Sequence, residues 1–328
     1  MPFEASDFPK GSPLNGWDTL SVRWDELLWA SITVGKAQRD LMRFGRYSFA
    51  EILHRVACLH AYYDIDKSHR LTPSPAFKTL DSTEKGVVSY YTGMAMAKLY
   101  ADKVLGIPWM MHISRYEVDW AVSYGANTNR PDLFGCNELG EWAVAEAKGR
   151  SRVTNKLVTK MQEQKSAVAS IQRVAPTYRY GSATKFEGGR LALRVVDPPR
   201  RRRAQDVPID PAAWLLDYYR PIVDLLDQTD AHHEGEAIVG TLPGTDIELG
   251  VSGTIAEVVR GSSERPIQRP GPRAAQVEDR GEERRSLGEQ TEDEELRVVV
   301  ERLTSSAREV APLEGATNDG LIVRSRRG

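Results

Sequence analysis

The spacing of apolar residues has two periods, which divide the chain into helical and extended parts. Apolar residues recur every three or four positions from Trp17 to about Asp64 and from Asp81 to about Leu105, which predicts helices there. Residues 1–16 are rich in Pro, Gly and Ser, and residues 67–78 contain two prolines, so both are expected to be irregular. The first third of the chain is therefore predicted to be mainly helical.

Beyond residue 108 the period changes to two, as in strands that bury one face. The pattern predicts strands at 109–113, 132–135 and 142–148, a helix from Thr154 to about Ile171, and a hairpin of 178–186 with 190–196. Together with the preceding helix, the order is helix, three strands, helix and strand pair. That order indicates an α/β domain in which helices pack on a small mixed sheet.

The C-terminal half alternates between ordered patterns and a charged segment. We expect a helix from Pro211 to Asp227, a strand from Ile247 to Val251, an amphipathic helix near 294–308 and a last strand after Asn318. Residues 261–295 are rich in Pro, Arg, Glu and Gly and contain few large apolar groups, which predicts a disordered linker.

These patterns predict four regions in the chain. They are an N-terminal helical extension (1–79), a main α/β domain (80–260), the charged linker (261–295), and a short helix with a C-terminal strand (296–328). The length of 328 residues fits one large domain or two modest ones.

Composition narrows the class of protein. Hydrophobic residues make up 41% of the chain and charged residues 27%, as in ordinary globular proteins. Two cysteines, Cys58 and Cys136, exclude a disulfide scaffold and a multi-cysteine zinc site. The first residues lack the pattern of a signal peptide, and no apolar run approaches the ~20 residues that span a bilayer. We therefore expect a cytoplasmic protein that has no membrane partner.

The net charge of −2 conceals a segregation of charge along the chain. Basic residues predominate from 148 to 203, whereas acidic residues concentrate at 278–295. The basic set comprises Lys148, Arg150, Arg152, Lys156, Lys160, Lys165, Arg173, Arg179, Lys185, Arg190, Arg194 and Arg200 to Arg203. Such an excess attracts a phosphate backbone, and the alternative is an ordinary solvated surface with a basic loop.

Three ionisable residues form the candidate site. In an extended strand alternate side chains share a face, so Glu146 and Lys148 point to one side of the strand 142–148, and three alanines point to the other. Asp132 lies 14 residues before Glu146, which leaves room for a turn and a neighbouring antiparallel strand. The two carboxylates can then converge, and a divalent cation would offset their repulsion. Mg²⁺ suits a site with few carboxylates, several waters and phosphate oxygens.

This arrangement resembles the PD-(D/E)XK nuclease superfamily through Pro131-Asp132 and Glu146-Ala147-Lys148. The resemblance implies a restriction-endonuclease-like core of α-β-β-β-α-β order between about residues 80 and 196. It also implies that Asp132 and Glu146 hold Mg²⁺ or Mn²⁺ together with the backbone carbonyl of Ala147. Lys148 would be the catalytic lysine. In exonuclease-like branches of the superfamily, a Gln at the position of Gln164 assists the site.

Other residues have two interpretations each. Glu84 can belong to the site, but its place after Asp81 favours a helix cap. His112 can approach the site, although a hydrogen-bonded core histidine is the favoured interpretation. His232-His233-Glu234 is interpreted as a surface loop rather than a metal cluster, because adjacent histidines in a strand point to opposite sides.

The sequence thus predicts a metal-dependent nuclease that hydrolyses phosphodiester bonds, with DNA as the favoured substrate. A catalytically inactive nucleic-acid-binding or scaffold protein on the same fold is the alternative. A third possibility is a protein–protein interaction module whose charges only keep it soluble. The sequence leaves open endo- or exonuclease action, DNA or RNA, sequence specificity, pathway and oligomeric state.

Overall fold

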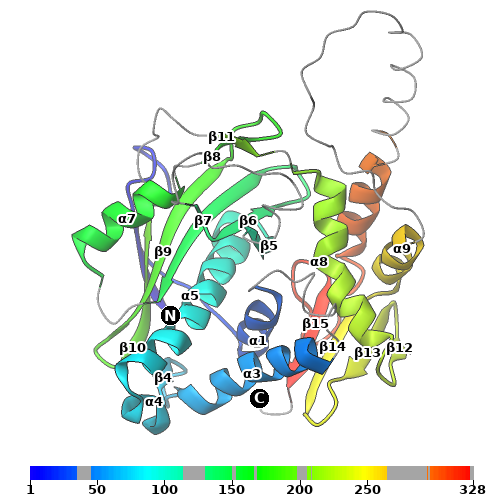
Figure 1. Cartoon of the computed structure of the whole chain (residues 1–328), viewed down its shortest axis with the longest axis horizontal. Helices are drawn as coiled ribbons and strands as arrows, with labels where there is room; N and C mark the ends of the chain where they lie inside the picture. The colour runs from blue at the N-terminus through cyan, green and yellow to red at the C-terminus, as the bar shows by residue number, and fades with distance from the viewer. Residues whose placement is uncertain are drawn as a thin grey trace, which may run out of the picture.

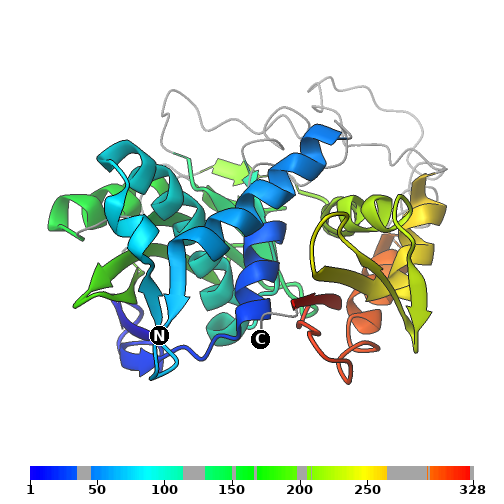
Figure 2. The same ribbon diagram turned by 90° about the horizontal axis from the view of Figure 1, so that it is seen from below.

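A computed structural model of the chain describes residues 1–34, 46–113, 130–149, 153–165, 168–197, 205–207, 209–263, 294 and 296–325. Within these ranges the protein is a mixed α/β structure that contains two main sheets. The sheets lie on opposite sides of helix α1 (Trp24–Thr33), as Figures 1 and 2 show. Among the described helices none has both the length and the apolar character needed to cross a bilayer.

The larger sheet has seven strands in the order β2-β1-β10-β9-β7-β6-β5. Two neighbouring pairs, β1 with β10 and β7 with β9, are parallel, and the other pairs are antiparallel. The strands are β1 (Pro2–Ser6), β2 (Gly16–Thr19), β5 (Trp109–His112), β6 (Leu133–Cys136), β7 (Trp142–Gly149), β9 (Tyr178–Glu187) and β10 (Arg190–Val196). The three predicted strands and the predicted hairpin are therefore confirmed.

The N-terminal residues differ from the prediction. Residues 1–16 were expected to be irregular, but β1 joins the large sheet beside β10, and β2 forms its outer edge. Phe3 and Ala5 alternate with more exposed neighbours and are buried, which is the period-two pattern of a strand. The alternation covers only five residues and begins at a proline, so the local pattern was too short to indicate a strand.

Of the elements predicted between residues 17 and 105, one helix is confirmed and the others differ from the prediction. Helix α5 (Ser82–Leu105) begins at the N-cap Asp81 and ends at Gly106, which adopts the left-handed conformation with φ 66°. The long helix expected from Trp17 to Asp64 is instead divided among β2, α1, α3 (Arg46–Tyr62) and β3 (Tyr63–Ile65), and residues 35–45 lie outside the described part. The expected loop 67–78 contains β4 (Leu71–Pro73) and most of α4 (Pro75–Thr79).

Helices α5 and α7 (Asn155–Lys165) cover opposite faces of the large sheet. A Cβ atom on Gly149 would meet the backbone of Ser89 in α5, whereas one on Gly181 would meet Met161 of α7. Gly149 has the same strand parity as the alanines of β7, so the predicted close packing of a helix on the alanine face is confirmed.

Helix α7 is shorter than predicted. Residues 168–171 were expected to continue it, but they form strand β8 (Val168–Ile171), which pairs in parallel with β11 (Gln205–Val207). The apolar spacing fits a helix as well as a strand whose two end residues are buried. The pairing with β11, 36 or 37 residues later in the chain, decides between the two.

The smaller sheet has the order β12-β13-β14-β15 and is covered by helices α8 (Pro211–Leu226) and α9 (Gly253–Ser263). Its strands are β12 (His232–Glu234), β13 (Ala237–Thr241), β14 (Ile247–Ser252) and β15 (Leu321–Ser325). The predicted last strand is confirmed as β15, and residues 296–306 are helical as expected. Of the predicted linker 261–295, residues 261–263 belong to α9, and residues 264–293 lie outside the described part.

A buried polar cluster joins the two halves of the molecule, which are the part around the large sheet and the part around the small sheet. The Lys98 ammonium in α5 donates to the hydroxyls of Thr33 and Tyr218 and lies 3.9 Å from Asp319, which precedes β15. Asp319 also accepts a hydrogen bond from the Trp29 indole at 2.8 Å, and both Lys98 and Asp319 are fully buried. These contacts connect the C-terminal segment to α5, the long helix that packs on the large sheet.

Candidate active site

The β6–β7 hairpin brings the three predicted residues together. Leu133 pairs with Ala145, so Asp132, immediately before β6, lies opposite Glu146. Lys148 follows two residues later on the same face of β7. The period-two pattern and the spacing of 14 residues therefore predicted this juxtaposition correctly.

Hydrogen bonds fix the positions of these groups. Asp132 Oδ2 accepts a hydrogen bond from the backbone N–H of Ala147 at 3.0 Å, and the Lys148 ammonium lies 3.5 Å from the same oxygen. The ammonium also donates to Glu146 Oε1. Lys148 thus contacts both carboxylates, and its side chain and that of Asp132 remain 17% and 19% exposed.

Glu146 is the buried member of the site. Its side chain is fully buried, because β7 is an inner strand and α7 packs on this face at Gly181, the register partner of Glu146. Burial, and to a lesser extent the charge of Asp132, raise the pKa of Glu146 to about 8, although the ammonium of Lys148 acts in the opposite direction. No N–H or O–H group of the described residues donates to Glu146 Oε2.

The donor set fits Mg²⁺ chemically. Glu146 Oε2 is a buried carboxylate oxygen that receives no hydrogen bond from the described residues, and Asp132 lies beside it. Within a strand the N–H and C=O of one residue point to the same side, so the Ala147 carbonyl is directed to the side of β7 where Asp132 lies. The described residues contain no cluster of three His, Cys, Asp or Glu side chains. Mg²⁺ commonly uses only one or two carboxylates and completes its shell with waters and phosphate oxygens.

Tyr90 is a neighbour of the site that the sequence did not indicate. It lies on α5, beside the Ser89 backbone on which Gly149 packs, and 43% of its surface is exposed. Burial raises the pKa of Tyr90, and the charges of Asp132 and Glu146 contribute to the same shift. Its position in α5, two residues before the continuously buried stretch that begins at Thr92, gave no local pattern that would have indicated it.

His112 also borders the site. It is buried in β5 opposite Leu133, and burial lowers its pKa to about 4, while the charge of Asp132 acts in the opposite direction. The favoured interpretation of a buried core histidine is therefore supported, and its ring lies within electrostatic range of Asp132.

The remaining predicted residues are placed as follows. Glu84 is exposed and completes a capping box, since its side chain accepts from the Asp81 N–H at 3.2 Å. Gln164 lies in α7, but its side chain is outside the described part. His232-His233-Glu234 is the short strand β12 rather than a loop, and both histidines are exposed.

Among the described residues, several members of the predicted basic set are engaged in ion pairs or hydrogen bonds. Arg194 pairs with Glu4, Lys185 lies 3.1 Å from Glu187, and Arg179 donates to the carbonyls of Val168 and Ala169. Of the predicted basic set in the described chain, the exposed members outside such pairs are Lys156, Lys160, Arg173 and Arg190. Arg150, Arg152 and the four arginines 200–203 lie outside the described residues.

Comparison of the chain with protein-family models, with curated proteins and with solved structures gives no match.

Proposed function

We propose that the protein is a metal-dependent nuclease that hydrolyses phosphodiester bonds at Asp132, Glu146 and Lys148, with DNA as the favoured substrate. The observation that carries the proposal is the contact of one ammonium group with two carboxylates at the open end of the β6–β7 hairpin. With β8 left aside, which pairs with β11 in a separate sheet, the order α5-β5-β6-β7-α7-β9 and the parallel pairing of β9 with β7 support a restriction-endonuclease-like core.

Each residue has a distinct role in this proposal. Asp132, Glu146 and the Ala147 carbonyl would hold Mg²⁺ or Mn²⁺, which supplies positive charge near the scissile phosphate and lowers the pKa of a bound water. The Lys148 ammonium donates hydrogen bonds to a phosphate oxygen or to the attacking water, which offsets the negative charge that develops in the transition state. The Ala147 N–H keeps Asp132 in place without using its second oxygen.

The environment of Glu146 supports a role for a cation. A carboxylate that is fully buried beside another carboxylate is costly to ionise, as its raised pKa reflects. Lys148 already contacts Glu146 Oε1, whereas Oε2 receives no hydrogen bond from the described donors. A divalent ion at Oε2 would stabilise the charged form of Glu146 and would be held by it in return.

The test is cleavage of end-labelled single- and double-stranded DNA in the presence of Mg²⁺, Mn²⁺ or EDTA. We expect metal-dependent cleavage by the wild type and a loss of at least about 100-fold in Asp132→Ala and Lys148→Ala. Glu84→Gln, a matched change at an exposed capping carboxylate, should retain activity. A wild-type protein that cleaves neither substrate with either metal contradicts the proposal.

The second candidate is a catalytically inactive nucleic-acid-binding protein on the same fold. It is favoured by Lys156 and Lys160, which are exposed four residues apart on α7, the helix that packs beside β7. Salt-sensitive binding of DNA without cleavage would support this function.

A further inference from the structure

A polar pocket lies at the turn of the β6–β7 hairpin, at the opposite end from Asp132 and Lys148. It has a volume of about 350 Å³, which is within the usual range for small-molecule sites. Four chain segments line it: the end of α5, the start of β5, the β6–β7 turn and the C-terminal part around residues 304–318. The pocket therefore lies where the two halves of the molecule meet.

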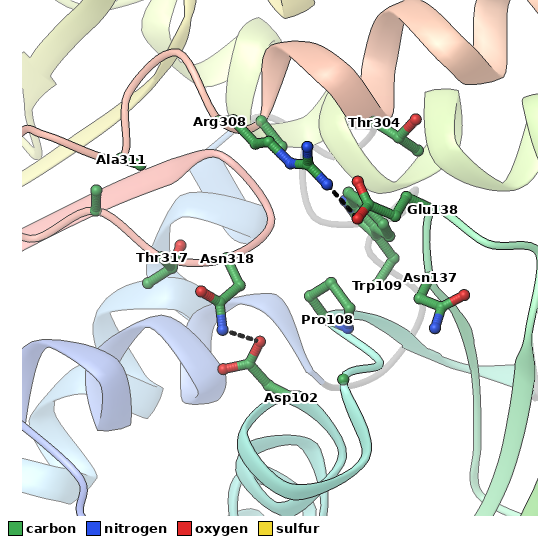
Figure 3. A pocket seen from close by; sticks show the side chains of 13 residues that line it. Asp102, Pro108, Trp109, Asn137, Glu138, Thr304, Arg308, Ala311, Thr317 and Asn318 are labelled. Carbon is green, nitrogen blue, oxygen red and sulfur yellow. Dashed lines mark hydrogen bonds and ion pairs between the residues drawn. The ribbon is translucent and has the colours of Figure 1, made fainter.

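Two polar contacts cross this pocket (Figure 3). The Asn318 amide donates to Asp102 Oδ1 at 3.0 Å, and the Arg308 guanidinium pairs with Glu138 at the β6–β7 turn. Arg308 is 72% exposed, so this ion pair lies at the mouth of the pocket, whereas Asp102 is only 7% exposed.

Asp102 lacks a cationic partner among the described residues. The nearby ammonium groups are both engaged elsewhere, since Lys98 donates to Thr33 and Tyr218, and Lys103 lies 2.8 Å from Glu26. Asp102 Oδ1 has one amide donor, and Oδ2 receives no hydrogen bond from the described residues. Buried carboxylates are normally paired or fully hydrogen-bonded, whereas Asp102 keeps one oxygen open to the pocket.

The surrounding charges favour a cation. The pocket contains two carboxylates, Asp102 and Glu138, and one guanidinium, that of Arg308. It also lies beside the C-terminal end of α5, where the helix dipole is negative. Burial raises the pKa of Asp102 to about 6, with Lys98 and Lys103 acting in the opposite direction and Asp319 in the same direction. A cation bound beside Asp102 would stabilise the charged carboxylate and so reduce the free energy needed to ionise it.

We propose that this pocket binds a small aliphatic amine, whose ammonium group pairs with Asp102. The Asn318 amide holds one carboxylate oxygen, so the other remains as the acceptor for the ligand. Pro108 and Trp109 supply apolar surface for the carbon chain. The site is separate from Asp132 and Glu146 and does not depend on nuclease activity.

The probe is 1,4-diaminobutane, with 1,4-butanediol as the neutral control of similar shape. Titration calorimetry and thermal unfolding of the whole chain, in an amine-free buffer at neutral pH and constant ionic strength, report binding. We expect saturable binding of the diamine, a higher Tm, and no effect of the diol. Asp102→Asn should weaken the affinity at least about tenfold, since a charge-assisted hydrogen bond is lost.

Two further variants keep the test decisive. Glu138→Gln changes an exposed side chain and leaves Arg308 unpaired at the mouth, so it should weaken diamine binding without loss of fold. Glu187→Gln, on the β9–β10 turn outside the pocket, should leave the affinity unchanged. Equal stabilisation by the diol, unchanged affinity in a folded Asp102→Asn protein, or no saturable binding by the wild type would overturn the proposal.

Discussion

The carboxylate of Asp132 accepts a hydrogen bond from the backbone N–H of Ala147, 3.0 Å away and 15 residues later in the chain. The Asp132 backbone N–H also donates to the Ala145 carbonyl at 3.0 Å. The two hydrogen bonds hold the Asp132 side chain beside Glu146 and Lys148. The geometry of the candidate site therefore depends on the backbone of β7 and on the surfaces against which β7 packs.

Substitution of Gly149 should disturb that backbone. A Cβ atom at Gly149 would lie 1.6 Å from the Ser89 carbonyl oxygen, so α5 and β7 must separate to accommodate alanine. We expect Gly149→Ala to lower the free energy of unfolding by at least about 2 kcal/mol. Gly86→Ala is the matched control, because its Cβ meets nothing within 4 Å and it lies within α5, where alanine is favoured by about 1 kcal/mol. Urea denaturation measures both, and equal stability of the two variants would contradict the packing described.

Lys98 should be essential for joining the two halves. Lys98→Ala leaves Asp319 buried without its nearest cation and opens a cavity between Trp29 and Tyr218. We expect a loss of about 3–5 kcal/mol. Lys103→Ala removes a partly exposed ammonium from Glu26, which keeps Arg23 at 3.2 Å, and should cost less than about 1 kcal/mol. Chemical denaturation distinguishes them, and similar losses for both lysines would show that the buried cluster is not the principal link.

The stability of the protein should depend on pH through Asp102. Its pKa is about 6 in the folded chain and 3.8 for the unperturbed group, so the fold favours the protonated form. The stabilisation is therefore complete below about pH 4 and is lost as the pH rises through about 6. Asp102→Asn cannot titrate, so relative to it the wild type should lose on the order of 2 kcal/mol between pH 4 and 7. Denaturation series in amine-free buffer measure this difference, and a difference that is constant with pH would refute the assignment.

Tyr90 should contribute to the binding of single strands. Its exposed ring is within electrostatic range of Asp132 and Glu146, and base stacking on an aromatic ring is worth about 1–3 kcal/mol. We expect Tyr90→Ala to weaken single-stranded DNA binding about 5- to 30-fold, and Tyr90→Phe to have little effect. Fluorescence anisotropy in EDTA measures binding without cleavage.

Trp17→Ala is the control for Tyr90, since Trp17 is 69% exposed on β2, at the outer edge of the large sheet. Its affinity should match that of the wild type. Equal losses in Trp17→Ala and Tyr90→Ala would indicate a non-specific effect of removing an aromatic ring.

The parts of the fold that the sequence predicted rest on local patterns. Asp132, Glu146 and Lys148 were found because a hairpin converts a short sequence separation into a contact, and because alternate residues of β7 share a face. The capping role favoured for Glu84 likewise rests on a spacing of three residues from Asp81.

The parts that were missed depend on distant partners. Lys98 and Asp319 are 221 residues apart, and neither has a local pattern that indicates a buried pair. Strand β1 is specified by its pairing with β10, and β8 by its pairing with β11. Asp102 was not recognised because its pocket forms only when the C-terminal segment packs against α5 and β5. Such features depend on tertiary packing, which a periodic pattern does not encode.

The central claim is that Asp132, Glu146 and Lys148 hydrolyse phosphodiester bonds with the help of a divalent ion. Its most direct test is the single-turnover rate of DNA cleavage in Mg²⁺ by the wild type and by Glu146→Gln purified in parallel, because this substitution preserves shape and removes only the charge. The account predicts metal-dependent cleavage by the wild type and a rate at least about 100-fold lower for a folded Glu146→Gln. Equal rates for the two proteins would contradict it.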